Sequence, residues 1–308
     1  MEGIKRINEL GGKKFWSSYN VLDLSKQHNS GNEKLFRKTG WNYINDQFNQ
    51  INPDELIVGN LADSFVYPFL LKNGKSFDEI TLLDDGTPTL DILNKRKENS
   101  FYKSYNLRSI KEMIKWVVYF KILSPIYSSP RNLKFFTLFD APFLKSEQYH
   151  QNKYAWLKSL ITTDELVNEA YFIGSNLPAR NIVSESVYLN SLEKIKTELS
   201  KRNLAMKYVQ HRGETQEILK KINEICPVIS FDGPLELAFL NQASPILFAS
   251  HFSSALFNLS RIYSKSENLA FLFPEEQLIG TAFENKNYLI NLQKEFKNDS
   301  LIKTNELS

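Results

Sequence analysis

The stretch Met206–Ile225, with the sequence MKYVQHRGETQEILKKINEI, decides the fold class of this 308-residue chain. It opens with a short apolar run, Met206–Val209, whose length and composition predict a buried strand. A helix is expected over Glu214–Ile225, because Ile218 and Ile222 recur at helical spacing. A buried strand that runs directly into an amphipathic helix is the repeating unit of α/β folds with a parallel sheet.

The second half of the chain repeats this unit several times. We expect strands at Tyr171–Gly174, Met206–Val209, Val228–Phe231, Ile246–Ala249 and Leu269–Phe273. Helices are expected at Glu185–Ser200, Glu214–Ile225, Pro234–Asn241, Ser253–Ser264 and Glu284–Phe296. Such alternation predicts a Rossmann-like domain.

The first half follows the same pattern less regularly. Its expected strands are Tyr19–Leu24, Glu55–Val58, Ile80–Leu83 and Leu133–Phe139. The domain boundary is expected near Ile161–Asp164, after a Tyr154–Leu160 helix, which gives domains of residues 1–162 and 163–308. Because the chain opens with the polar, helix-like Met1–Leu10, a first strand is expected to be missing. Two Rossmann-like domains with a cleft between them describe the GT-B architecture of nucleotide-sugar glycosyltransferases.

Composition limits the classes of function. With 42% hydrophobic and 13% aromatic residues, the chain has enough apolar material for two folded domains. The net charge of +3 fits an anionic substrate or an anionic membrane surface, and no basic-aromatic stripe indicates nucleic acid. The single cysteine, Cys226, excludes an internal disulfide, and the four histidines lack the spacing of a metal site. We therefore expect neither a metal nor a cofactor.

No apolar run approaches the roughly 20 residues that span a bilayer, and no signal peptide opens the chain, so a cytoplasmic location is expected. The segment Ile110–Leu123 alternates apolar residues with lysines. We expect a core helix with lysines at its edge. The alternative is a peripheral helix on the inner face of the cytoplasmic membrane. The oligomeric state does not follow from the sequence.

Three short motifs follow expected strands. The first is Asp84-Asp85-Gly86, directly after the Ile80–Leu83 strand. The carboxyl ends of parallel strands face the ligand crevice of an open α/β sheet, so a carboxylate there is well placed to transfer a proton. The alternative interpretation is a plain turn, since Asp-Gly is a common turn dipeptide.

The second motif is His211-Arg212, between the Met206–Val209 strand and its helix. A histidine at this point can donate a hydrogen bond or a proton to a leaving phosphate, and Arg212 adds positive charge. The alternative is a surface histidine in a strand-to-helix turn, with Glu214 as an acidic residue at the start of the helix.

The third motif is Ser253-Ser254, which follows the strand Ile246–Ala249. Two hydroxyls and the free N–H groups of a helix start can bind phosphate. The alternative is that serine simply caps the helix. Nearby, Glu236 lies in the first turn of another expected helix, where a carboxylate can bind ribose hydroxyls or cap the helix.

In their order and spacing these motifs resemble those of the bacterial GT-B sialyltransferases, especially the lipooligosaccharide sialyltransferase family and its polysialyltransferase relatives. That group carries an acidic-acidic-Gly, a His-Pro and a Ser-Ser/Thr motif. The resemblance covers most of the chain and includes Tyr171–Gly174 at the opening of the donor domain. One departure is that Arg212 stands where the family has proline, which changes the loop after His211.

The resemblance implies a metal-independent, inverting sialyltransferase. CMP-sialic acid would be the donor, and the acceptor a sugar hydroxyl, expected to be galactose, on a bacterial surface glycan such as lipooligosaccharide, O-antigen or capsule. Asp85 would be the general base beside Asp84, and His211 would stabilise the departing phosphate. The implied donor-binding residues are Gly86, Gly174, Ser175, Arg212, Glu236, Ser253 and Ser254.

Two alternatives stay open. In the first, the enzyme uses another CMP-activated sugar acid as donor, such as legionaminic acid or Kdo, or it extends a polysialic chain. From a different class, the chain is a non-catalytic glycan-binding relative of a glycosyltransferase.

Overall fold

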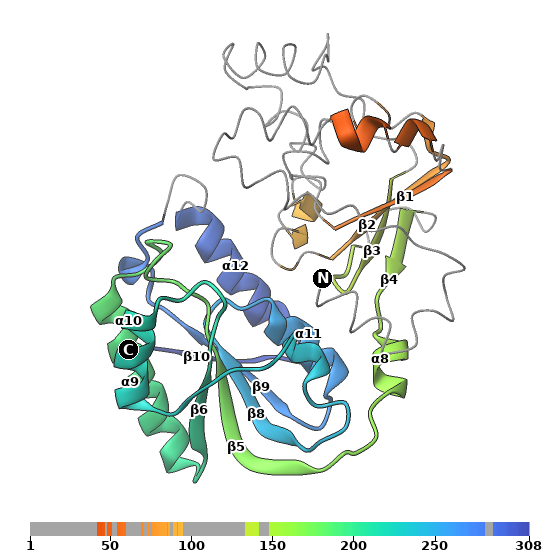
Figure 1. Cartoon of the computed structure of the whole chain (residues 1–308). Helices are drawn as coiled ribbons and strands as arrows, with labels where there is room; N and C mark the ends of the chain where they lie inside the picture. The colour runs from red at the N-terminus through yellow and green to blue at the C-terminus, as the bar shows by residue number, and fades with distance from the viewer. Residues whose placement is uncertain are drawn as a thin grey trace. The chain divides into compact units, whose positions relative to one another are not determined.

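The structure is a computed structural model that describes residues 42–46, 48–50, 54–59, 69–70, 73, 76–84, 86, 89–90, 92–94, 133–141, 148–280 and 286–307. The chain divides into two compact units, Met1–Asn152 and Lys153–Ser308. This division precedes the expected boundary after residue 162. The helix α8 (Ala155–Ser159), expected at the end of the first domain, therefore belongs to the second unit (Figure 1).

Unit 1 contains a parallel sheet in the described part of the chain. Its strands β1 (Glu55–Val58), β2 (Glu79–Leu83), β3 (Leu133–Thr137) and β4 (Tyr149–Gln151) lie side by side in chain order. Alternate residues of β2 and β3 point into the core, and Ile80, Leu82, Leu133 and Phe135 are almost fully buried. The first three strands agree with those expected from the sequence.

The expected strand Leu133–Phe139 ends early, at Thr137. The reason is that side chains take the backbone N–H groups that further pairing would need. The Leu138 N–H donates to Asp84 Oδ2 at 2.7 Å, and the Phe139 N–H donates to Thr137 Oγ1 at 3.2 Å. Polar side chains near a strand end compete with the sheet in this way.

Unit 2 contains a six-stranded parallel sheet with the order β10-β9-β8-β5-β6-β7. Its strands are β5 (Leu166–Ile173), β6 (Ala205–Val209), β7 (Val228–Ile229), β8 (Ser244–Ser250), β9 (Glu267–Leu272) and β10 (Lys303–Glu306). Counted from β5, this is the 3-2-1-4-5-6 order of a doubly wound Rossmann fold. The expected Rossmann-like domain is confirmed.

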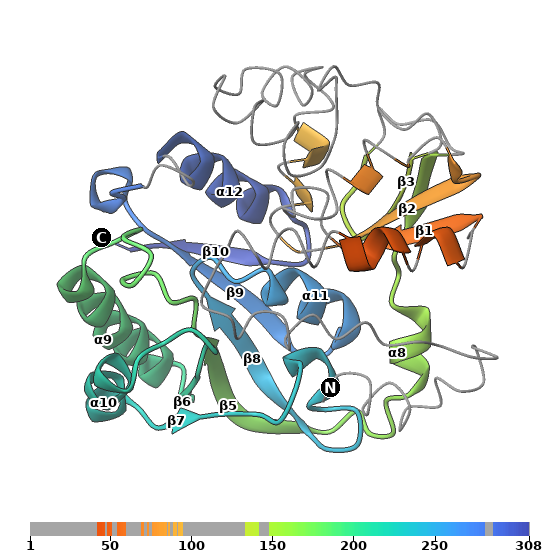
Figure 2. The same ribbon diagram turned by 45° about the horizontal axis from the view of Figure 1, so that its top comes forward.

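Helices cover both faces of this sheet. Because the chain steps from β5 to β7 in one direction and from β8 to β10 in the other, right-handed crossovers place the two sets of helices on opposite faces. Helices α9 (Glu185–Lys201) and α10 (Gln216–Ile225) lie on one face, and α11 (Ala255–Ile262) and α12 (Lys286–Asn298) on the other (Figures 1 and 2).

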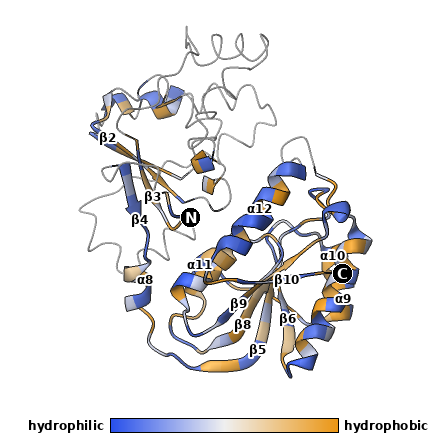
Figure 3. Cartoon of the chain, turned by 180° about the vertical axis from the view of Figure 1, so that it is seen from behind, coloured by the Kyte–Doolittle hydropathy of each residue, from blue (hydrophilic) through white to orange (hydrophobic). Residues whose placement is uncertain are grey.

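Buried strands and two-sided helices form the core of unit 2. In Figure 3 the central strands carry mainly hydrophobic residues, whereas the helices present a hydrophilic and a hydrophobic side. The most deeply buried large side chains include Phe172, Tyr208, Phe248 and Phe271 on neighbouring strands. This is the pattern of a parallel sheet buried on both faces.

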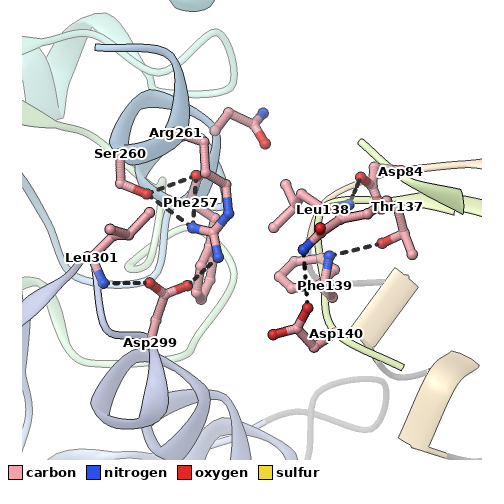
Figure 4. Close-up of polar contacts among 12 residues, drawn as sticks. Asp84, Thr137, Leu138, Phe139, Asp140, Phe257, Ser260, Arg261, Asp299 and Leu301 are labelled. Carbon is pink, nitrogen blue, oxygen red and sulfur yellow. Dashed lines mark hydrogen bonds and ion pairs between the residues drawn. The ribbon is translucent and has the colours of Figure 1, made fainter. Parts of the chain in front are cut away.

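Helices α11 and α12 are joined at two points. The rings of Phe257 and Phe296 stack with their centroids 4.4 Å apart. The Arg261 guanidinium contacts Asp299 at 2.6 Å and also donates to the Phe257 carbonyl oxygen (Figure 4). Because the Asp299 side chain is only 8% exposed, this ion pair is largely shielded from solvent and fixes the C-terminal ends of both helices.

The expected helix Pro234–Asn241 was wrong. The segment forms only the 3-10 helix η4 (Leu235–Leu237), preceded by Gly233 with a φ of 106°. The Tyr263 hydroxyl donates to the Glu236 carbonyl oxygen at 2.8 Å, so a side chain takes the acceptor that a continuing helix would use. Tertiary contacts override the local helical preference here.

Strands β4 and β10 were not expected. Strand β10 reads Lys-Thr-Asn-Glu and pairs with β9 at the edge of the sheet, so it lacks the apolar run that marks a buried strand. The expected elements Met1–Leu10, Tyr19–Leu24 and Ile110–Leu123 lie outside the described residues. The α/β class with two parallel sheets, of the GT-B type, is confirmed. The cleft remains a prediction.

Candidate active site

The strand order of unit 2 reverses between β5 and β8, and this switch point positions the candidate site. In open parallel sheets, ligands bind at the carboxyl ends of the strands where the order reverses. The loops after β5, β6 and β8 all leave this edge of the sheet. These loops carry the predicted residues Gly174, Ser175, His211, Arg212, Ser253 and Ser254.

Gly174 follows strand β5 at a point where the neighbouring strand β6 approaches closely. Its N–H donates to the Val209 carbonyl oxygen at 2.9 Å. A Cβ atom at this position would lie 2.4 Å from Tyr208 Oη and 3.0 Å from Glu214 Oε1. The side chains of Tyr208 and Glu214 therefore fill the space where a side chain at position 174 would lie. Packing alone explains why this residue is glycine, without a ligand.

Ser175 presents a polar group that the protein does not satisfy. The residue is 7% exposed, and its hydroxyl is among the few buried side-chain groups in the described residues that lack a hydrogen-bond partner. The next residue, Asn176, adopts a positive φ of 50°, the left-handed conformation that asparagine tolerates in turns. A buried hydroxyl without a partner at a strand end indicates a place where a polar ligand group or water completes the bonding.

His211 follows strand β6 and is partly buried. Its Nδ1 accepts the Gly213 N–H at 3.0 Å, so in the neutral ring Nε2 carries the proton and is the donor. Burial lowers the pKa of His211, and the nearby charges of Arg212 and Arg180 lower it further. A neutral N–H donor close to two arginines suits an anionic group.

The loop after β8 is fixed by a serine and ends in two half-buried serines. The Ser250 hydroxyl donates to the Ile173 carbonyl oxygen at 3.1 Å and accepts the Ser253 N–H at 3.0 Å, which joins β8 to β5. Ser254 occupies the N-cap position of α11, yet its side chain accepts no hydrogen bond from the helix. The capping role weighed for this serine is therefore not observed, and its hydroxyl is not used as a cap.

His251, in the same loop, is buried and has a structural role. Its Nδ1 contacts the Phe271 carbonyl oxygen at 2.8 Å, and its Nε2 contacts Ser191 Oγ at 3.0 Å. The rings of Phe172 and Phe273 pack against it, with centroids 5.1 and 4.1 Å away. Burial lowers the pKa of His251 to about 3, so the imidazole is neutral in the folded protein.

Glu236 lies beside helix α11. Its Oε1 accepts a hydrogen bond from the Asn258 side-chain amide at 2.6 Å, and Tyr154 in turn donates to Asn258 Oδ1 at 2.8 Å. Asn258 lies one turn after Ser254 on the same helix. The carboxylate is thus held against helix α11 one turn after Ser254, and its predicted ribose-binding role stays a prediction.

In unit 1, Asp84 ends strand β2 and ties it to β3 through the Leu138 N–H (Figure 4). Gly86 has a φ of 66°, and its carbonyl oxygen accepts the Thr89 N–H at 3.0 Å, which is the geometry of a turn. Asp85, the predicted general base, lies outside the described residues. The bond at Gly86 runs onward from Gly86 to Thr89, so both the turn interpretation of Asp84-Asp85-Gly86 and the catalytic role of Asp85 stay predictions.

Sequence reasoning missed four residues at this edge, namely Tyr188, Tyr208, Asn176 and Arg180. In the sequence, Tyr208 is typical of a core residue in a buried strand. Tyr188 is typical of the apolar face of a helix, here α9. The signal that was available is a tyrosine in an expected buried strand with a glutamate six residues later in the sequence, because a buried hydroxyl requires a partner.

The described residues contain no group of three or more His, Cys, Asp or Glu side chains arranged to hold a metal ion. Nor does any helix in this part of the chain combine the length and apolar character needed to cross a bilayer.

The fold is similar to that of a solved sialyltransferase. The structure of an α/β-galactoside α-2,3-sialyltransferase from the luminous marine bacterium Photobacterium phosphoreum matches with a TM-score of 0.52 and 17% sequence identity. The match covers 99% of this chain and 95% of the other. Comparison of the sequence with known protein families and with curated proteins finds no match. At this identity, the likeness establishes the shared architecture.

Proposed function

We propose that this chain is an inverting sialyltransferase that moves sialic acid from CMP-sialic acid to a sugar hydroxyl of a bacterial surface glycan. One observation carries the proposal: the loops after β5, β6 and β8, which leave the carboxyl edge of the unit 2 sheet at its switch point, carry the unpartnered hydroxyl of Ser175, the imidazole of His211 and the Ser254 hydroxyl that does not cap its helix. These groups suit a phosphate. The fold likeness to a sialyltransferase supports the donor class.

On the donor side, each group has a role that its surroundings support. Ser253 and Ser254 at the start of α11 would hold the phosphate oxygens of CMP, aided by the helix dipole. The Nε2–H of His211 would donate to the same phosphate as its bond to the sugar breaks, and Arg212 would add positive charge. Glu236, held beside α11 by Asn258, would bind the ribose hydroxyls.

The reaction is a single displacement. The acceptor hydroxyl oxygen, expected to be that of galactose, attacks the anomeric carbon of sialic acid, and the bond from that carbon to the phosphate oxygen breaks. Asp85 takes the acceptor proton, and CMP departs with the bonding electrons as an anion. Asp84 orients the neighbouring segment through Leu138. The scheme routes no step through a metal.

Calorimetry tests the donor class. We expect the protein to bind CMP in preference to UDP and GDP, and Ser254→Ala to weaken CMP binding severalfold. Glu275→Gln, at an acidic position in η5 outside the site, is the control and leaves binding unchanged. Preference for UDP or GDP would refute the donor assignment.

Release of CMP tests the reaction. With CMP-sialic acid and a galactose-terminated acceptor, wild-type protein should release CMP and form a sialylated product, and Asp85→Ala should lose about 10²–10⁴-fold in turnover. CMP-Kdo and CMP-legionaminic acid in parallel identify the donor sugar. Glycan binding without CMP release from any donor would instead identify a non-catalytic glycan-binding protein, and near-normal turnover of Asp85→Ala would remove Asp85 as the base.

A further inference from the structure

The buried carboxylate of Glu214 joins the loop after β5 to the loop after β6. Glu214 is 9% exposed and lies outside helix α10, whose N-cap is Thr215. Its Oε1 accepts a short hydrogen bond from the Tyr208 hydroxyl, and its Oε2 accepts the His211 N–H at 2.8 Å. The backbone of Asn176 donates to the same carboxylate.

The network continues to a second tyrosine. The hydroxyl oxygens of Tyr188 and Tyr208 lie 2.7 Å apart, and both rings are fully buried. The backbone N–H of Ser175 in turn bonds to the Tyr188 hydroxyl. The Tyr208 hydroxyl has one hydrogen and donates it in the hydrogen bond to Glu214. Tyr188 must therefore be the donor in its bond with Tyr208, so every donor in this series of hydrogen bonds points toward the carboxylate.

These bonds make Glu214 the shared anchor of two loops. The β5 loop is held at Asn176 directly and at Ser175 through the tyrosines, and the β6 loop is held at His211. Burial raises the pKa of Glu214, whereas the bonds from Tyr208, His211 and Asn176 lower it. A carboxylate with this number of donors is satisfied inside the protein and is not a site for substrate.

We propose that Glu214 is a positioning residue for His211: its carboxylate holds the His211 backbone against the β5 loop and so orients the imidazole Nε2–H at the carboxyl edge of the sheet. The proposal rests on the proposed function for the role of His211 in catalysis, but the orientation itself is a property of this protein alone. No helix-capping task explains Glu214, since α10 is capped by Thr215.

Two substitutions weaken the anchor to different degrees. In Glu214→Gln, the side chain keeps its size, but an NH2 group replaces one carboxylate oxygen. This group faces hydrogen-bond donors and cannot accept a hydrogen bond from them. Tyr208→Phe keeps the ring and removes one of the donors. Glu217→Gln, on the exposed side of α10, is the matched control. All are compared with His211→Ala.

Steady-state kinetics give the first readout. We expect Glu214→Gln to lower kcat about 10–100-fold with the donor KM changed less than about twofold, because the lost interaction acts in the transition state. Tyr208→Phe should have a smaller effect of the same kind, and Glu217→Gln none. Adding Glu214→Gln to His211→Ala should cost little more, since both remove one function. Full additivity of the two losses would overturn the proposal.

Imidazole ¹⁵N NMR gives a readout independent of activity. In wild-type protein His211 should show the Nε2–H tautomer with a lowered pKa. In Glu214→Gln the Nδ1 contact with Gly213 should be lost, and the pKa should return toward its ordinary value. Unchanged His211 signals would refute the positioning role. If wild-type protein transfers no sialic acid but these signals change, the proposed function fails and the positioning inference holds.

Discussion

Two loops at the same sheet edge are built in opposite ways. In the loop after β6, the internal carboxylate of Glu214 accepts hydrogen bonds from the backbone N–H of His211 and from the hydroxyl of Tyr208 in β6 itself. In the loop after β8, Ser250 fixes the backbone, but Ser254 is half-buried and leaves its helix uncapped. The first loop is thus held by bonds within the protein, whereas Ser254 in the second does not cap its helix.

The difference indicates how the site divides its work. A group that must keep one orientation while charge develops benefits from internal bonds that are already formed. A group that holds an incoming phosphate must keep its hydrogen-bonding capacity until the ligand arrives. The comparison therefore predicts that changes in the β6 loop affect turnover or folding, and that changes at Ser253 and Ser254 in the β8 loop affect binding.

The largest expected effect is on His211. His211→Ala should lower kcat about 10²–10⁴-fold while CMP still binds, because in the proposed reaction the imidazole acts on the departing phosphate, and the loop stays anchored by Glu214. Parallel measurements of CMP release and CMP calorimetry separate the two effects. Loss of CMP binding with unchanged kcat would reverse the assignment of the two loops.

Gly174→Ala should destabilise unit 2. The new methyl group would meet Tyr208 Oη at 2.4 Å in a buried position, so the anchor of Glu214 must shift. Overpacking of this kind typically costs about 1–3 kcal/mol in the free energy of unfolding. Urea denaturation followed by circular dichroism measures it. Gly59→Ala, where nothing lies within 4 Å of the new Cβ, is the control and should change little.

His251 should make folding stability depend on pH in the β8 loop. Its folded pKa of about 3 lies below the ordinary value, so the unfolded chain takes up the proton first as the pH falls. The stabilisation is complete above about pH 6.5 and is lost toward pH 3, by up to about 1.4 kcal/mol per pH unit.

The variant His251→Asn tests this assignment, because its amide keeps the donor to the Phe271 carbonyl oxygen and does not titrate in this range. Urea unfolding at pH 7, 6 and 5 should give a steeper loss of stability for wild-type protein than for His251→Asn. Equal slopes would show that His251 is not the group responsible. His211 and Glu214 are present in both proteins, so their contributions to the pH dependence cancel when the two slopes are subtracted.

The sequence was a good guide to elements with strong apolar patterns. Strands β6 and β8 and helix α9 lie close to where the sequence predicts them, whereas β5 begins at Leu166, five residues before the expected Tyr171. It failed where tertiary contacts decide. The hydroxyl of Tyr263 stops a helix at Glu236, and β10 is a polar strand defined only by its neighbour β9. Neither cause is a local property of the segment concerned.

For the candidate site, the sequence predicted loops that do lie at the carboxyl edge of the unit 2 sheet, but it did not indicate which bonds fix each loop. Glu214 reads as an acidic residue at a helix start, since its distance from a strand tyrosine in space is invisible in the sequence. The structure shows it buried against Tyr208, with Thr215 as the N-cap. Gly174 likewise reads as a ligand-facing glycine, although Tyr208 and Glu214 fill its space.

The smallest expected effect compares two helix starts. Thr215 Oγ1 accepts the Ile218 N–H at 3.4 Å, so Thr215→Ala should cost about 1 kcal/mol of stability by removing a cap. Ser254→Ala removes no cap and should cost less than about 0.5 kcal/mol, yet it alone should weaken CMP binding. Denaturation and calorimetry on both variants measure the contrast. If Ser254→Ala proved the more destabilising, its hydroxyl would be a structural group and the β8 loop would resemble the β6 loop.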